Sequence, residues 1–194
     1  MTQKVDRRVR KTKAALRAGL IKLMQTKSIR EITVRELVEE VDINRSTFYL
    51  HYTDIYDMLN KIEQELIDEL INVTLTHKKE YYNDKVQFYL EEVFTILLEN
   101  IDICMLLIGP NGDLNFINNV KNLIKDNITQ TTIELLNGTQ SVEEIEYAVA
   151  FYLGACVGLI EKWLFDGAKE SPKELSVLCY KLLRNGLVSY IPEF

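Results

Sequence analysis

One short segment of the chain combines side chains that together can bond a nucleic acid. It follows the turn Asp42-Ile43-Asn44 and would present five side chains on the outer face of a helix: Arg45, Ser46, Thr47, Tyr49 and His51. Short hydroxyls let the backbone approach base edges, and an arginine can bond a guanine or a phosphate. Phenol and imidazole groups can bond phosphate oxygens. The segment is therefore suited to a DNA groove.

Two short helices must position this segment. Thr33-Val34-Arg35-Glu36 is a capping box, in which the threonine hydroxyl caps the backbone N–H of Glu36 and the carboxylate reaches back. It predicts a helix from Val34 to Val41, and Asn44 can cap a second one from Arg45 to His51. Two helices of about eight residues around a short turn have the dimensions of a helix-turn-helix. Any helical hairpin with a polar surface has similar spacing, so that alternative stays open.

The rest of the chain indicates an all-α fold. It has 194 residues, 47% of them hydrophobic and 27% charged, with only 3 Pro and 8 Gly, which excludes disordered, collagen-like and disulfide-dense proteins. Apolar residues recur every three or four positions, which predicts about nine helices and no strand. The seven helices outside the helix-turn-helix are expected at about residues 6–25, 55–75, 84–99, 103–108, 114–136, 142–165 and 172–189.

Charge is distributed unevenly along the chain. Residues 1–52 carry 12 Lys or Arg against 6 Asp or Glu, whereas residues 53–194 carry 11 against 23. A basic beginning on an acidic body indicates a polyanion-binding end. A solvated basic helix would give the same count.

The residue strings carry a family resemblance. Ile32-Thr33-Val34-Arg35-Glu36-Leu37, the run from Ile43 to Tyr52, then Asp54 and Met58-Leu59 closely resemble the N-terminal domain of TetR-type transcriptional regulators. The similarity extends back through Lys11-Thr12-Lys13-Ala14-Ala15-Leu16 and covers about residues 8–62. It implies a DNA-binding domain over residues 1–68, joined by a long helix to an effector-binding and dimerisation domain over residues 69–194.

The resemblance also implies roles for single residues. Thr33, Tyr49 and His51 correspond to phosphate contacts, Arg45, Ser46 and Thr47 to base-edge readers, and Arg35 to either. The other expected DNA contacts are Arg10, Lys11, Val34, Asn44 and Tyr52. Many relatives have a lysine just inside the long helix where Ile55 stands here, and the basic arm of Arg7, Arg8, Arg10 and Lys11 could substitute for it.

In TetR-type proteins the last two long helices pack against their twofold mates as a four-helix bundle. The corresponding dimer residues here are Gly154, Ala155, Gly158, Leu175, Leu178 and Leu182. Packing within one chain is the alternative for the small residues. The run from Gly158 to Leu164, followed by Gly167 and Ser171-Pro172-Lys173-Glu174, resembles a firmicute-like C-terminal regulatory domain, a subtype that includes co-regulators answering to a protein partner.

Aromatic residues crowd the C-terminal region. We expect six of them to line an effector pocket: Tyr89, Phe94, Phe116, Phe151, Tyr152 and Trp163. Ordinary core packing would need the same residues, and the sequence identifies no effector.

Catalysis, metals and membranes find little support in the sequence. There are two His and none of the common hydrolase, nucleotide-binding or zinc motifs, so we expect no enzyme, no cofactor and no metal. Cys104, Cys156 and Cys179 are far apart in apolar surroundings, as reduced thiols of a cytoplasmic protein would be, with a redox switch as the alternative. The charge-free run Tyr147–Ile160 is shorter than the roughly 20 residues of a bilayer span, which predicts a buried helix and no membrane contact.

These observations predict a cytoplasmic, homodimeric transcription factor on double-stranded DNA. We expect a repressor released from a pseudo-palindromic operator by a small effector. A TetR-like co-regulator controlled by a protein partner is the main alternative, and a helical adaptor that has lost DNA binding is a third.

Overall fold

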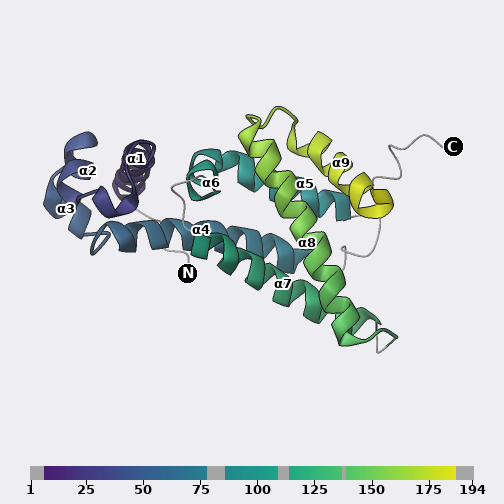
Figure 1. Ribbon diagram of the computed structural model, residues 1–194. Coiled ribbons are helices and arrows are strands. Elements are labelled where there is room, and N and C mark those ends of the chain that lie inside the picture. The colour runs from purple at the N-terminus through teal and green to yellow at the C-terminus, as the bar shows by residue number, and fades with distance from the viewer. Residues whose placement is uncertain (1–6, 78–85, 109–113, 137–138, 187–194) are drawn as a thin grey trace.

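The computed structural model describes residues 7–77, 86–108, 114–136 and 139–186, and within them the chain is helical with no strand (Figure 1). A small head lies at one end and a larger helical body at the other, joined by one long helix. The elements are α1 (Arg7–Met24), a 3-10 turn (Ile29–Glu31), α2 (Val34–Glu40), α3 (Arg45–Tyr49), α4 (Ile55–Thr76), α5 (Val86–Glu99), α6 (Ile101–Ile108), α7 (Leu114–Leu136), α8 (Val142–Phe165) and α9 (Pro172–Asn185).

The all-α prediction is confirmed, and the helix ends differ from it only slightly. α3 ends at Tyr49, two residues early, and α6 begins at Ile101. The expected ends at Asp6, Asp84 and Ser189 lie outside the described residues. The long helix continues without a break across the expected domain boundary at residue 68, so head and body share α4.

Local capping explains where most helices begin. The boxes at Thr33, Ser141 and Ser171 each have both of their hydrogen bonds, and Asp54 accepts from the Asp57 amide to start α4. A further box, between Ser28 and Glu31, opens the 3-10 turn that the sequence reading missed. Each cap satisfies backbone N–H groups that a helix start leaves unpaired.

The head has its own small core. Leu16 and Leu20 of α1, Leu37 of α2, Phe48 of α3 and Met58 of α4 are fully buried. α1 approaches α2 closely at Gly19, where an added Cβ would overlap Cγ1 of Val41 and lie 3.1 Å from Cδ1 of Leu37. Glycine is therefore the residue that this crossing requires.

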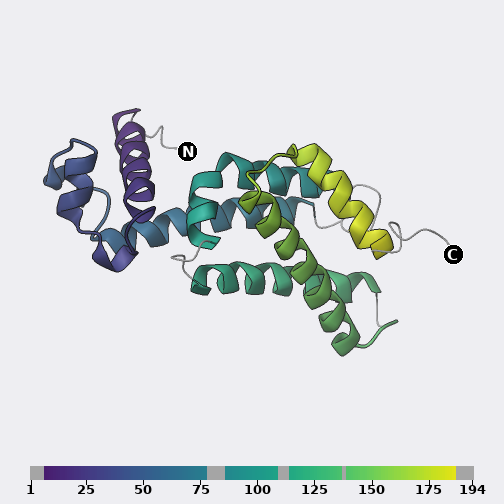
Figure 2. The ribbon, with the colours of Figure 1, turned by 45° about the horizontal axis from the view of Figure 1, so that its top comes forward.

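The body wraps α5 to α9 around the second half of α4. α5 packs on α9, α7 on α8, and α4 on both α5 and α7, while α8 crosses the body diagonally (Figure 2). α6 lies at the head end of the body and contacts α1. Head and body are therefore linked by the continuous α4 and also by the contact between α1 and α6.

The prediction that residues 147–160 form a buried helix is wrong for the single chain. Tyr147 and Phe151 of α8 are each 72% exposed, and Tyr152 is 47% exposed. Tyr147 and Phe151 are four residues apart and therefore share one exposed face of α8. By length and composition alone α8 would suffice to cross a membrane, which is weak evidence for a span.

Candidate functional site

The turn between α2 and α3 fixes the direction of the short helix α3. Asp42 adopts a left-handed conformation with a φ of 52°, which a short polar side chain tolerates better than most. The Ile43 amide then donates to the Val38 carbonyl oxygen at 3.0 Å, and Asn44 Oδ1 accepts from the Ser46 amide at 2.9 Å. The first residues of α3 are thus held by local bonds.

α3 turns one face to the core and one to solvent. Phe48 is fully buried, whereas Arg45, Ser46 and Tyr49 are exposed and Thr47 is half-buried. The Arg45 guanidinium carbon lies 5.9 Å from the centre of the Tyr49 ring, so the two side chains share one surface. Donors and acceptors of several kinds therefore project from this face.

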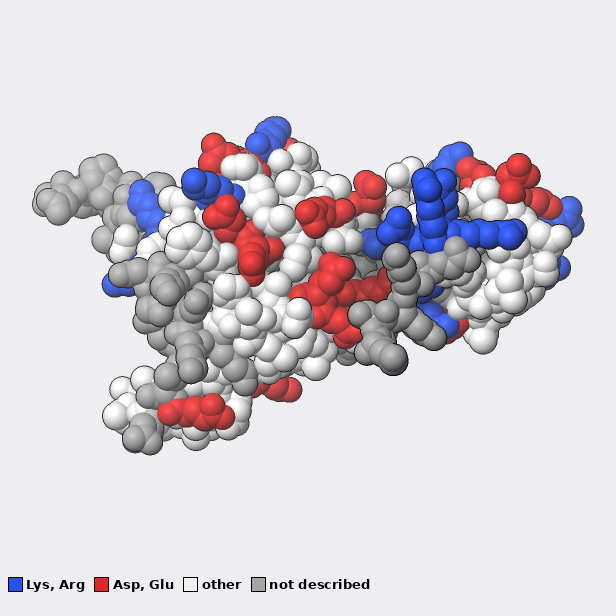
Figure 3. Space-filling model, turned by 180° about the vertical axis from the view of Figure 1, so that it is seen from behind, with Lys and Arg blue, Asp and Glu red and all other residues white. Residues whose placement is uncertain are grey.

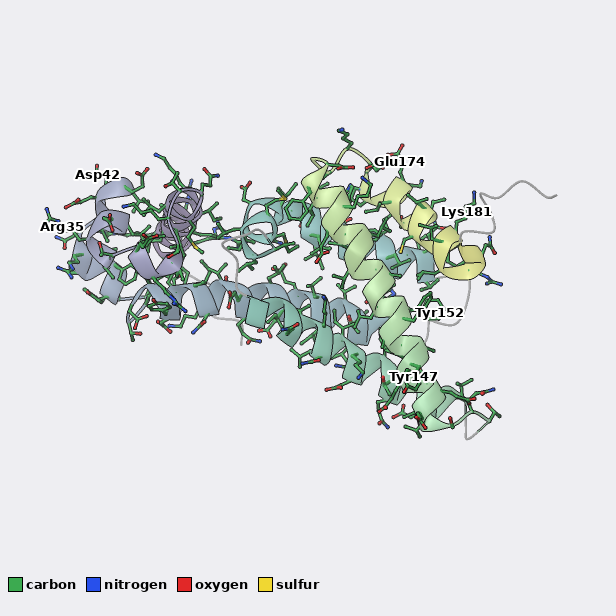
Figure 4. The ribbon with its side chains drawn as sticks, viewed as in Figure 1. Arg35, Asp42, Tyr147, Tyr152, Glu174 and Lys181 are labelled. Carbon is green, nitrogen blue, oxygen red and sulfur yellow. The ribbon has the colours of Figure 1, made fainter. Side chains whose placement is uncertain are left out.

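The start of α2 adds hydrogen-bonding groups beside this face. The Thr33 hydroxyl accepts from the Glu36 amide at 3.2 Å, and Lys27 Nζ lies 2.6 Å from Glu36 Oε1. The lysine and the bonds from Thr33 lower the pKa of Glu36 to about 2. Arg35 projects at the outer end of the head, away from the body, where its Nε donates to Glu39 at 2.8 Å (Figure 4).

Tyr52 does not belong to the exposed face. It is 5% exposed, its ring centre lies 5.6 Å from that of Phe48, and burial raises its pKa to about 12. The prediction that Tyr52 contacts DNA is therefore wrong, and Tyr52 is a residue of the head core. His51 and Val34 are half-buried, and Lys61 of α4 donates to the His51 carbonyl oxygen at 3.2 Å.

Basic residues begin α1. Arg7, Arg8, Arg10 and Lys11 are all exposed, and Lys and Arg side chains gather beside the head on the face shown in Figure 3. Acidic side chains form several patches over the body on the same face. The charge asymmetry of the sequence thus becomes an asymmetry of the surface.

The body contains a cavity of about 750 Å³ that is partly open to solvent. Its walls are mostly apolar and come from every helix of the body, including Leu66 and Leu70 of α4 and Cys104 and Ile108 of α6. Polar groups such as Lys121 and Glu144 are few among the lining residues. The cavity suits a molecule with a large apolar part.

Three of the aromatic residues expected in a pocket line this cavity: Tyr89, Phe94 and Tyr152. Trp163 does not, because it is buried behind Phe94, 5.9 Å between ring centres, and donates its Nε1–H to the Glu170 carbonyl oxygen at 2.9 Å. Phe151 points outward on α8 and is exposed. The side chain of Phe116 lies outside the described residues.

The small residues of α8 form part of an exposed face. Gly154, Ala155 and Gly158 are exposed, and among the described residues nothing beyond the neighbouring residues and backbone of α8 lies within 4 Å of a Cβ built on either glycine. Leu178 and Leu182 of α9 are half-buried. Leu175 is only 2% exposed because it packs inside the chain, so it is not available to a partner.

The family model described as "Transcriptional regulator C-terminal region" of TetR-type proteins matches residues 84–185, more than half of the chain. This chain is a TetR-type transcriptional regulator.

Solved structures share the fold of this TetR-type regulator. The fatty acid degradation regulator FadR from Bacillus halodurans has a TM-score of 0.68 at 16% identity, over 90% of this chain and 95% of that one. The dihydroxyacetone kinase operon activator DhaS has a TM-score of 0.60 at 18% identity, over 89% and 94%. A TetR transcriptional regulator from Streptococcus agalactiae 2603V has a TM-score of 0.57 at 22% identity, over 92% and 96%. No curated protein matches the sequence.

Sequence reasoning missed several cavity residues of this TetR-type regulator. Leu66 and Leu70 were visible only as members of the apolar stripe of α4, and Val120, Ile124 and Ile128 as members of the stripe of α7. An apolar stripe gives the same signal whether it faces packed side chains or empty space. In the described residues no group of three or more His, Cys, Asp or Glu could hold a metal ion.

Proposed function

We propose that this TetR-type regulator is a cytoplasmic repressor that binds a pseudo-palindromic DNA operator as a homodimer and leaves it when a small, largely apolar molecule occupies the body. The observation that carries the proposal is the apolar cavity whose wall includes α4, the helix that also carries the head. Neither an enzymatic reaction nor a cofactor is part of the proposal.

The face of α3 supports the DNA-binding part of the proposal. Arg45, Ser46 and Thr47 would read base edges, because they lie at the start of a short, exposed helix with no bulky apolar neighbour before Phe48. Tyr49, His51 and Thr33 would bond phosphate oxygens. The exposed basic residues Arg10 and Lys11 would add sequence-independent attraction.

The exposed face of α8 supports the homodimer. Tyr147, Phe151 and Gly158 share one side of the helix, and covering such aromatic side chains removes apolar surface from water. A twofold dimer would place two heads about one turn of DNA apart, roughly 34–36 Å, on an inverted repeat.

The cavity gives the effector a physical route to the head. A ligand inside it would contact Leu66 and Leu70 of α4 together with Cys104 and Ile108 of α6. α4 anchors the head through Ile55, Met58 and Leu59, and α6 contacts α1. A ligand that prefers one arrangement of α4 and α6 shifts the spacing of the heads by that preference alone.

The names of these neighbours do not favour repression. One is called a fatty acid degradation regulator and another an operon activator. We propose repression because the cavity lies between helices that link to the head. The ligand-free protein would hold the heads in the DNA-binding arrangement, and a ligand that displaces these helices would disturb it.

The test is selection of sequences from a random duplex library, followed by binding of the selected duplexes across a salt series. An enriched inverted repeat, with steep salt dependence and binding lost in Thr47→Ala and Tyr49→Ala, would support the operator. Enrichment of no sequence, with salt-sensitive binding retained, would contradict specific recognition. Lys125→Ala, which removes a basic residue on α7 of the body, is the control.

A protein partner in place of a small effector is the second candidate function. The observation that favours it is the large exposed aromatic area at Tyr147 and Phe151. Sedimentation of the purified chain separates the two. If the variants Tyr147→Ala and Phe151→Ala remain dimers and bind the operator but no longer respond in cells, the face serves a partner. If both variants become monomers, it serves the second copy.

A further inference from the structure

Cys156 of α8 and Cys179 of α9 face each other across the contact between these two helices. Their sulfur atoms are 4.0 Å apart, although 23 residues separate them in the chain. Cys179 is 2% exposed and Cys156 is half-buried. The third cysteine, Cys104, lies on α6 and has no hydrogen bond to either of these two thiols among the described contacts.

Small molecules can reach this pair from two sides. Cys156 lines the large cavity of the body, and it also lines a second hollow of about 540 Å³ between α8 and α9. Cys179 lines only the second hollow. If a partner subunit covers the outer hollow, the cavity still leads to Cys156.

The two thiols have different chemical roles. The S–H of Cys179 directed at Cys156 stabilises a thiolate there, which lowers the pKa of Cys156 and raises that of Cys179. The thiolate is the nucleophilic form of cysteine. Cys156 lines both hollows whereas Cys179 is almost fully buried, so Cys156 is the sulfur that an oxidant reaches first, and Cys179 lies 4.0 Å away, close enough to react with it next.

We propose that Cys156 and Cys179 form an oxidation site at which a hydroperoxide converts the two thiols to a disulfide that links α8 to α9. The Cys156 thiolate attacks the terminal oxygen of the hydroperoxide, the O–O bond breaks, and a sulfenic acid and an alkoxide are formed. The alkoxide takes up the proton that the Cys156 thiol had released to water and leaves as an alcohol, or as water when the oxidant is hydrogen peroxide. Cys179 sulfur then attacks the sulfenic sulfur, its proton joins the departing hydroxide, and water leaves. The dithiol loses two electrons and two protons, and the hydroperoxide gains them.

The disulfide changes the geometry of the body. Bonded sulfur atoms lie about 2.0 Å apart, so the pair must approach by about 2 Å from its present separation. Leu183 and Arg184 of α9 line both hollows next to Cys156, so closing the pair moves a wall of the cavity. The chemistry itself is independent of the proposed repressor function, whereas any effect on operator binding rests on it.

The experiment treats the purified full chain with hydrogen peroxide and then blocks remaining thiols with iodoacetamide before mass analysis. We expect the intact chain to lose two hydrogen atoms, peptides containing Cys156 and Cys179 to be joined, and Cys104 to carry the blocking group. Cys179→Ser should stop at the sulfenic acid of Cys156, trapped with dimedone, whereas Cys104→Ser should form the disulfide as the parent does.

Three results would overturn the proposal. They are two blocked thiols at residues 156 and 179 after peroxide treatment, a disulfide joining two chains instead of one, and irreversible oxidation of Cys156 in the parent chain. All are read by mass and need no DNA, so failure of the oxidation site is separate from failure of the repressor assignment. If the disulfide forms and the duplex from the selection experiment still binds equally well, oxidation does not regulate binding and the modification site itself stands.

Discussion

Arg17 of α1 donates a hydrogen bond from its guanidinium to Asn100 Oδ1 at 2.6 Å, joining the head to the body beside the continuous α4. Asn100 follows the last residue of α5 and precedes α6, and its own Nδ2 donates to the Ile96 carbonyl oxygen at 2.9 Å. The side chain that receives Arg17 is therefore itself fixed. A displacement of α6 by a ligand in the cavity would act on α1 through this bond.

The first prediction concerns this link. Arg17→Ala should lower the free energy of unfolding by about 1 kcal/mol, less than a fully buried charged hydrogen bond because Arg17 is half-buried. In a double-mutant cycle measured by urea denaturation, the variant that carries both Arg17→Ala and Asn100→Ala should lose less stability than the sum of the two single variants, because both remove the same bond. Lys13→Ala, whose partner Glu65 is 3.6 Å away on the surface, is the control and should change little. Additive effects of Arg17→Ala and Asn100→Ala would show that the bond carries no coupling.

The crossing of α1 and α2 gives the second prediction. Gly19→Ala places a methyl group against Cγ1 of Val41, a β-branched side chain with little freedom to move. The variant should lose about 1–3 kcal/mol of stability from overpacking. Val41→Ala in the same chain should restore part of the loss, which chemical denaturation of both variants measures. A Gly19→Ala protein as stable as the parent would mean that the helices separate at no cost.

Much of the fold could be predicted because helix starts depend on neighbours in the sequence. Ser141 and Ser171 each bond a glutamate three residues later, so a window of four residues decides where α8 and α9 begin. The short turn before Asn44 is likewise fixed by bonds between residues that are close in the sequence. Helix ends are less certain, because the last carbonyl groups can be satisfied in several ways, and α3 accordingly ends earlier than expected.

The site could be predicted only where chemistry and burial agree. Tyr52 has a side chain suited to a phosphate, yet its ring fills space beside Phe48 in the head core. Leu175 has the periodicity of an interface residue, yet it packs within its own chain. The face of α8 shows the opposite case, since the apolar run predicts burial whereas Phe151 is 72% exposed in the single chain.

The third prediction is a pH dependence at the capping box of α2. The folded-state pKa of Glu36 is lowered from 4.5 to about 2, so this carboxylate stabilises the fold above about pH 4.5 and loses that contribution as the pH falls toward 2. Glu36→Gln should therefore be less stable than the parent at pH 7, and the difference should shrink below pH 4.5 in urea titrations. Thr33→Ala removes the other half of the box as a matched variant. A difference that stays constant from pH 7 to pH 3 would contradict the ionic origin.

The fourth prediction uses the empty space beside Gly158. Apart from α8 itself, no described residue lies within 4 Å of a Cβ built there, so Gly158→Leu should leave the folding of a single chain intact. In a close-packed dimer the same side chain would meet the partner helix and weaken association. Analytical ultracentrifugation should show a monomer at concentrations where the parent is a dimer, with an unchanged helical circular dichroism spectrum. A Gly158→Leu protein that dimerises as the parent does would place the interface elsewhere.

The fifth prediction separates two tyrosines that the sequence alone treats alike. Tyr49 is 49% exposed beside Arg45, whereas Tyr52 is 5% exposed within the head core. Tyr49→Phe removes a hydroxyl that would bond a phosphate and should weaken operator binding by about 2- to 10-fold, as expected for a hydrogen bond of about 0.5–1.5 kcal/mol. Tyr52→Phe keeps the buried ring and should leave affinity unchanged. Fluorescence anisotropy with the selected duplex measures both, and the loss in Tyr49→Phe should be equal for matched and mismatched duplexes because a phosphate contact carries no sequence information. If Tyr52→Phe weakened binding and Tyr49→Phe did not, DNA would contact the head through a different face from the one that α3 exposes.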